Sequence, residues 1–98
     1  EEFMRLLSTN DSYIAYGINE VEEAVKNNAV SKLVIAESMF RQYENRKRLE
    51  KILDEAARRR AEIIIAPYDS QVEKQVIGLG GVIAILRFPL EYLRNKDQ

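Results

Sequence analysis

Three nearly continuous apolar runs are the strongest pattern along this chain. They occupy residues 32–36, 62–66 and 82–86, and polar or turn-forming residues bound each of them. Runs in which apolar residues do not alternate with polar ones are typical of strands covered on both faces of a sheet. The pattern therefore predicts three buried strands. Residues 13–16, which combine two tyrosines with an isoleucine, predict a fourth strand that ends at a glycine turn.

Apolar residues at helical spacing separate these runs. The clearest helix is predicted over residues 45–60, where apolar positions recur every three or four residues. Arg46 with Glu50 and Lys51 with Glu55 are pairs of opposite charge four residues apart, and we expect them to stabilise the helix surface. The basic triplet Arg58-Arg59-Arg60 lies at the end of this helix, where positive charges interact favourably with the helix dipole. Binding of a phosphate is the less favoured interpretation.

Three shorter helices complete the predicted elements. One follows the first strand, with Asn19 and Glu22 in the spacing of a capping box. Another is capped by Asp69 or Ser70 and leads into a glycine-rich turn. The third covers residues 1–8, where apolar positions again recur at helical spacing.

The order of these elements predicts the class of fold. Strands that alternate with helices are typical of an α/β domain, here with a mostly parallel or mixed sheet of four strands and helices on both faces. A chain of 98 residues, 46% of them hydrophobic, can bury one modest core, so we expect a single domain over residues 1–98. Because the sequence starts without methionine and within a helical pattern, we expect it to be a fragment of a longer protein.

The glycine-rich segment 78–81 leads directly into the apolar run at 82–86. Phosphate-binding glycine loops follow a strand and open a helix, so their context differs from this one. The segment instead favours a tight turn, in which glycine permits a positive φ or a close approach of two backbones. Pro89 has no N–H to donate and is expected to stop the strand that follows the turn.

The composition limits the catalytic and metal-binding sites that this chain can form. The chain has no cysteine and no histidine, which removes thiolate metal sites and the commonest catalytic base. The cluster of Glu20, Glu22 and Glu23 is interpreted as a solvated helix face, and no nucleophile lies beside a base. A net charge of −1 and a pI near 5.6 give no broad electrostatic attraction to nucleic acid. We therefore expect a soluble, intracellular, non-enzymatic protein without a metal or cofactor.

Two segments are candidate binding sites. In the first helix, Met4 lies beside the apolar stripe of Phe3, Leu6 and Leu7, so apolar groups could remain available to a protein partner. That all four residues belong to the core is an equally good interpretation. The second candidate is Gly17-Ile18-Asn19-Glu20, whose amide and carboxylate at a helix N-terminus could read the edges of nucleic-acid bases.

Motifs along nearly the whole chain resemble the C-terminal domain of the Pelota family, which is related to the archaeal and eukaryotic class one release factors. They are Phe3-Met4-Arg5-Leu6-Leu7, Tyr16-Gly17 followed by Val21 and Ala24, Ala29-Val30 with Leu33-Val34-Ile35, Met39-Phe40-Arg41, and Gly81 through Leu90. The short spacing between Phe40 and Leu49 also resembles Pelota, because release factors carry an extra minidomain there. The order and spacing of these motifs are more specific than any one of them.

The resemblance implies a three-layer α/β/α sandwich, an archaeal source and a cytoplasmic role in ribosome rescue and no-go decay of mRNA. Within that role it implies a non-catalytic adaptor that docks a translational GTPase related to elongation factor one alpha, with an ABC-type recycling ATPase as a further candidate partner. In the related release factors, apolar residues of the first helix dock the GTPase. The corresponding positions here are Met4 and Leu7, with Phe3 beside them. An RNA-cleaving activity attributed to the family resides in an N-terminal domain that this sequence lacks.

The alternative function comes from the same fold superfamily. Gly17-Ile18-Asn19-Glu20 is similar to the motif with which kink-turn-binding ribosomal proteins recognise guanines. Those proteins also have basic residues just before the glycine, where this chain has Ala15 and Tyr16, and a lysine one residue before the alanine, where it has Glu23. An acid facing phosphate would repel it, so the resemblance favours the adaptor. A helix cap is the structural interpretation of Asn19.

Overall fold

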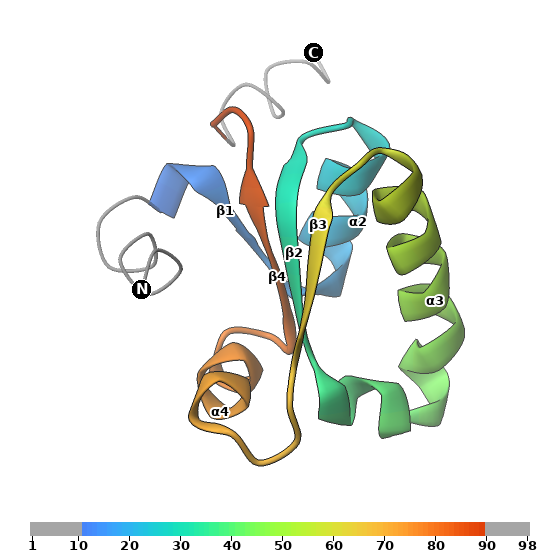
Figure 1. The fold of residues 1–98 in the computed structure, drawn as a ribbon, viewed down its shortest axis with the longest axis vertical. Coiled ribbons are helices and arrows are strands. Elements are labelled where there is room, and N and C mark those ends of the chain that lie inside the picture. The colour runs from blue at the N-terminus through green and yellow to red at the C-terminus, as the bar shows by residue number, and fades with distance from the viewer. Residues whose placement is uncertain (1–10, 90–98) are drawn as a thin grey trace.

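The computed structural model describes residues 11–89, which alternate strands with helices as the sequence predicts (Figure 1). In chain order the elements are η1 (Asp11–Tyr13), β1 (Ile14–Tyr16), α2 (Gly17–Lys26), β2 (Val30–Ala36), η2 (Glu37–Arg41), α3 (Tyr43–Arg58), β3 (Glu62–Ala66), α4 (Gln71–Gly78) and β4 (Val82–Leu86). The predicted bounds of β3 and β4 are confirmed. The predicted helix at 1–8 lies outside the described residues.

The four strands form one mixed sheet in the order β1-β4-β2-β3. β2 and β3 are parallel, with Leu33 beside Ile63, whereas β4 is antiparallel to both β1 and β2. The predicted four-stranded sheet is confirmed, and of the two arrangements left open, mostly parallel or mixed, it is the mixed one. The reason is the short path before β4. α4 lies near the carboxyl ends of β2 and β3 and passes into β4 after residues 79–81, so β4 must run back in the opposite direction (Figure 1).

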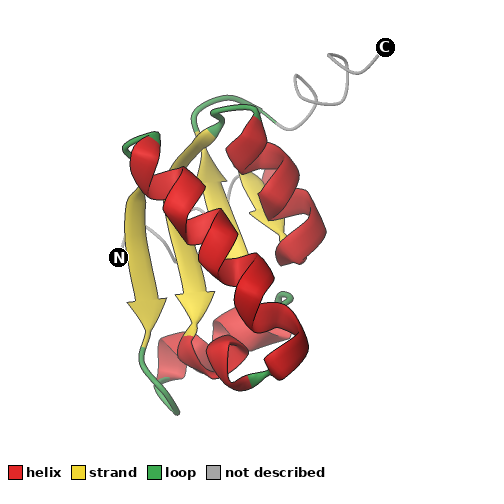
Figure 2. Cartoon of the chain, turned by 90° about the vertical axis from the view of Figure 1, so that its right-hand side faces the viewer, coloured by secondary structure: helices red, strands yellow, loops and turns green. Residues whose placement is uncertain are grey.

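Helices lie on both sides of this sheet. α2 and α3 cover one face side by side (Figure 2), and α4 lies on the other side, at the lower end of the sheet in Figure 1. The two helix layers confirm the α/β sandwich. The largest fully buried side chains are Ile14, Leu33, Ile35, Leu49, Ile83, Val21, Val34, Val76 and Val82. They come from β1, β4 and β2 and from the apolar face of each helix, which places the core between the layers.

The position of each strand in the sheet decides how far it is covered. All five residues of β4 are buried, as the apolar run predicts for a central strand. β3 is an edge strand, and its Ile65 is 40% exposed although the paired Ile35 is 0% exposed. The prediction that β3 is covered on both faces is therefore wrong. A continuous isoleucine run looks the same in sequence whether or not a further strand lies beside it.

α2, α3 and α4 end in the same turn. Two residues beyond each helix, a residue with positive φ donates its N–H to a carbonyl three residues back, and the next N–H reaches a carbonyl five residues back. This is the Schellman arrangement, which satisfies carbonyls that the helix leaves unpaired. The residues at the positive-φ position are Asn28 (φ 56°), Arg60 (φ 65°) and Gly80 (φ 117°).

The surface pairs predicted on α3 are confirmed in part. Arg46 lies 3.5 Å from Glu50, as expected for a pair four residues apart. Glu55 pairs with Arg59 at 2.9 Å, so the predicted Lys51 pair is wrong. Of the basic triplet, only Arg58 lies within the last turn of the helix, because α3 ends there.

Candidate functional site

The junction between β1 and α2 holds the candidate RNA motif. β1 ends at Tyr16 and α2 begins at Gly17, whose φ is 86°. The Glu20 carboxylate reaches back and accepts the N–H of Tyr16 at 2.9 Å. Glu20 therefore satisfies a main-chain donor at the start of the helix. The predicted capping box of Asn19 and Glu22 is wrong, because the helix starts two residues before Asn19.

Asn19 instead contacts the neighbouring helix. Its side-chain oxygen accepts a hydrogen bond from Arg48 of α3, and the same guanidinium pairs with Glu22 at 2.9 Å. The hydrogen bond from Arg48 lowers the pKa of Glu22 below its ordinary value. Glu22 is therefore part of a bridge between α2 and α3, and only Glu23 is the exposed acid that the sequence predicts. The structure brings Gly17, Asn19 and Glu20 together, with the latter two already hydrogen-bonded.

A close approach of two backbones fixes this junction. A Cβ added to Gly80 would lie 3.0 Å from the Cα of Gly17, and one added to Gly81 would lie inside the Met39 side chain. The prediction that the glycine turn needs small residues for packing is confirmed. Beside it is an open depression of about 410 Å³, lined in part by Ile18, Gln42 and Ile77.

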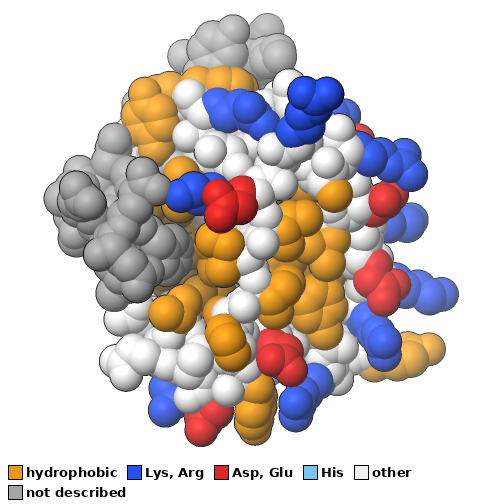
Figure 3. All heavy atoms as spheres, viewed as in Figure 1, with side chains coloured by type: hydrophobic (Ala, Val, Ile, Leu, Met, Phe, Trp, Pro, Cys, Tyr) orange, Lys and Arg blue, Asp and Glu red, His pale blue; other side chains and the backbone are white. Residues whose placement is uncertain are grey.

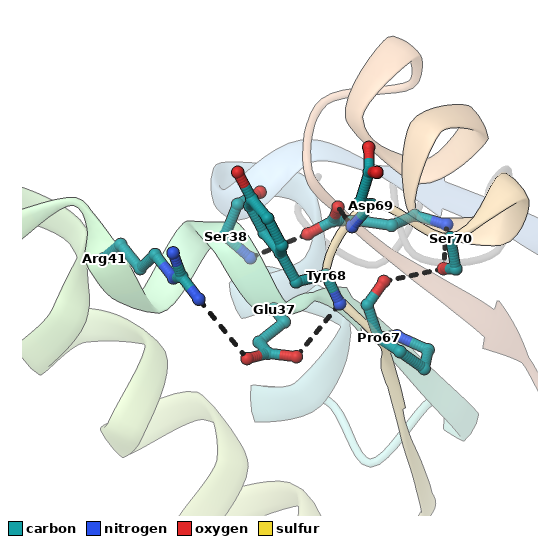
Figure 4. A network of polar contacts seen from close by, with 8 residues as sticks. Glu37, Ser38, Arg41, Pro67, Tyr68, Asp69 and Ser70 are labelled. Carbon is teal, nitrogen blue, oxygen red and sulfur yellow. Dashed lines mark hydrogen bonds and ion pairs between the residues drawn. The ribbon is translucent and has the colours of Figure 1, made fainter.

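Hydrogen bonds to carboxylates join the turns that follow β2 and β3 (Figure 4). Glu73 of α4 is 2% exposed and accepts the N–H of Ser38 at 2.9 Å and that of Asp69 at 2.6 Å. Burial acts to raise the pKa of Glu73, but the hydrogen bonds from Ser38 and Asp69 and the charge of Arg41 together outweigh it and leave the pKa below its ordinary value. From the other turn, Glu37 accepts the N–H of Tyr68 at 3.0 Å. The two turns therefore hold each other in place.

Ser70 completes the start of α4. Its hydroxyl accepts the N–H of Glu73 at 3.1 Å and donates to the carbonyl of Pro67 at 2.6 Å. Of the two predicted caps, Ser70 is confirmed. Nothing in the sequence analysis singled out Glu73, although an acid three residues after a serine cap is the signal of a capping box.

An apolar surface surrounds this pair of turns. The large exposed apolar side chains of residues 12–89 are Tyr43, Ile65, Tyr68 and Ile77. Figure 3 shows apolar side chains gathered where β3 lies in Figure 1. Arg41 stacks on the ring of Tyr68, with its guanidinium carbon 4.3 Å from the ring centre. Sequence reasoning missed this surface because it assigned β3 to the interior of the sheet.

The predicted partner-binding residues Phe3, Met4 and Leu7 lie outside the described residues and stay a prediction. Within residues 11–89, no group of three or more acidic side chains could hold a metal ion. No helix in that part of the chain has both the length and the apolar character needed to span a membrane.

Comparisons with known proteins place the chain in one family of translation-factor domains. Residues 1–90 match the family described as eRF1 domain 3, and the chain belongs to that family. A protein pelota homolog from Staphylothermus marinus is 52% identical over 98 residues, covering 98% of this chain and 28% of the relative. The chain thus spans about a quarter of the length of the curated relatives it matches.

Solved structures share the fold. A model of ribosome-bound archaeal Pelota and ABCE1 contains a chain 30% identical to this one, with a TM-score of 0.78, covering 90% of this chain and 24% of that one. Saccharomyces cerevisiae Dom34, a translation termination-like factor that interacts with Hbs1, has a TM-score of 0.83 at 23% identity, over 94% of this chain and 27% of that one. This second likeness shows the fold alone. The family resemblance that the motifs indicated is confirmed.

Proposed function

We propose that this chain is the non-catalytic adaptor domain of a ribosome-rescue factor. The observation that carries the proposal is the 52% identity to a pelota homolog over 98% of the chain. The 30% identical archaeal Pelota, which shares this fold, is ribosome-bound together with ABCE1. In the full-length protein, this domain would dock a translational GTPase and the ABC-type recycling ATPase in the cytoplasm.

The GTPase would bind the first helix through Met4 and Leu7, with Phe3 supporting them. Apolar side chains that a partner buries contribute to binding, because their surface is removed from water. The surface formed by Ile65 and Tyr68 offers a second apolar area on the described part of the domain, and would suit the other protein partner.

Acidic substitutions in the full-length protein test the first-helix site. Met4→Glu with Leu7→Glu should weaken capture of the GTPase at least tenfold, because two apolar contacts are replaced by charges that must be desolvated. Tyr43→Glu is the matched control, since Tyr43 is 92% exposed and lies on α3. Equal capture of all three proteins would reject the site. Thermal unfolding of each variant separates lost docking from lost folding.

The kink-turn alternative has weaker support. Asn19 is hydrogen-bonded to Arg48 and Glu20 to Tyr16, so both would have to leave these partners before they could read a base. Glu23 adds an exposed negative charge on the same helix. A gel shift with a kink-turn RNA at micromolar protein tests this function. A shift that is lost in Asn19→Ala would favour the RNA-binding module over the adaptor.

A further inference from the structure

Arg60 has a left-handed backbone conformation, which arginine seldom adopts. The equivalent residues after α2 and α4 are Asn28 and Gly80, the two residue types that adopt a left-handed conformation most readily. Arg60 adopts the same conformation, with φ 65°, and a side chain with a Cβ is disfavoured there. The turn at the end of the helix would form equally well with asparagine or glycine. The turn therefore does not explain why an arginine occupies this position.

A second arginine is fixed beside it. Arg87, just after β4, donates from Nε to the carbonyl of Val30 at 3.1 Å and from Nη2 to the carbonyl of Arg59 at 3.1 Å. An arginine has five N–H donors, so three of them remain for another acceptor. Arg87 is exposed, and these two bonds already hold its side chain in place. Ordering it in a complex would therefore cost little further entropy.

The charges of these two arginines are not neutralised by carboxylates. Arg58 pairs with Asp54 at 2.9 Å and Arg59 with Glu55 at 2.9 Å. Among residues 11–89, by contrast, neither Arg60 nor Arg87 makes an ion pair. The helix dipole offers only about half a negative charge at this end, which is less than two guanidinium groups carry. Figure 3 shows Lys and Arg side chains at the upper end, where β2 and β3 begin in Figure 1.

We propose that Arg60 and Arg87 form a contact for the phosphate backbone of RNA. A planar guanidinium with free N–H groups matches the geometry of phosphate oxygens. None of the four exposed large apolar residues in the described part of the chain lies at this end, which argues against a protein partner, because protein interfaces have an apolar centre. The inference rests on the proposed function, since the ribosome supplies the RNA.

The test uses the full-length protein and purified archaeal ribosomes, with affinity measured by co-sedimentation over a series of salt concentrations. Arg60→Gly should reduce the slope of log affinity against log salt by about 0.7–0.9, with up to about a tenfold loss of affinity near 0.1 M salt. Arg60→Lys, which keeps the charge, should restore most of the slope. Lys47→Gln is the matched control, because it removes one positive charge near the other end of α3, about 20 Å away.

Arg60→Gly also separates binding from folding. Glycine favours the left-handed conformation, so this variant should unfold at a temperature no lower than the wild type. If Arg60→Gly binds ribosomes with the wild-type slope, the inference is wrong and the proposed function stands. If the wild type does not bind ribosomes, both are wrong. If Arg60→Gly weakens only a complex with the isolated GTPase, the arginines face an acidic protein surface, which also overturns the RNA contact.

Discussion

The carboxylate of Glu73 accepts a hydrogen bond of 2.9 Å from the main-chain N–H of Ser38, although 35 residues separate them in the chain. Its other oxygen accepts the N–H of Asp69 at 2.6 Å. One buried side chain therefore joins the turn after β2 to the turn after β3. These are also the turns that border the exposed apolar surface of Ile65 and Tyr68.

Removing this carboxylate should destabilise the domain. Glu73→Ala leaves two N–H groups without their acceptor, and a buried donor that loses its partner is costly. Glu73→Gln keeps one carbonyl oxygen and should lie between alanine and wild type. Melting temperatures from circular dichroism measure the effect. Glu44→Gln, an exposed acid on α3, serves as the control, and equal melting temperatures for all four proteins would contradict the role of Glu73.

The same group predicts how stability depends on pH. The pKa of Glu73 is lowered in the folded protein, so its contribution is complete above the ordinary carboxyl pKa of about 4.3 and is lost as the pH falls through the lower native value. In that interval the unfolded chain binds more protons, which means that stability rises with pH. Denaturant unfolding between about pH 2 and 7 should therefore give a shallower curve for Glu73→Gln than for wild type. Parallel curves would rule out a lowered pKa.

Two glycines near the end of α4 should respond in opposite directions. Gly80→Ala places a Cβ 3.0 Å from the Cα of Gly17 at φ 117°, and should cost about 2 kcal/mol or more. Gly78 lies within α4, and a Cβ there meets nothing within 4 Å. Gly78→Ala should therefore stabilise the domain by about 0.5–1 kcal/mol. Urea denaturation of both variants measures the difference, and the same sign for both would refute the packing of the glycine turn.

A pair of isoleucines tests the edge position of β3. Ile35 and Ile65 are paired in register, but their exposures are 0% and 40%. Ile35→Ala should cost about 2–5 kcal/mol through lost burial and a cavity. Ile65→Ala should cost only about 1 kcal/mol, because part of its surface stays in water in both states. Equal losses in free energy of unfolding would mean that β3 is covered on its outer side.

The apolar pattern predicted the elements better than their arrangement. The bounds of β3 and β4 follow from short runs rich in β-branched residues, each bounded by polar or turn-forming residues. The direction of β4 cannot be predicted in this way, because it depends on which end of the sheet α4 ends at. The edge position of β3 is equally hidden, since Ile63, Ile64 and Ile65 would suit a central strand as well.

The candidate site shows a similar limit. Gly17, Asn19 and Glu20 were found from local spacing, but the partner of Asn19 is Arg48, 29 residues away on another helix. Such a contact depends on how α2 packs on α3, which no local pattern records. For Glu73, the spacing from Ser70 carried a local signal of a capping box, but its contact with Ser38, 35 residues away, is visible only in the fold.

The antiparallel pairing of β1 with β4 has a mechanical consequence. Ile14 lies beside Ile85 and Tyr16 beside Ile83. The start of β1 and the end of β4 therefore lie at the same end of the pair of strands. A force that pulls these ends apart would load the hydrogen bonds one after another, as in a zipper, rather than all at once. We therefore expect the domain to open at low force when it is stretched between its first and last strands.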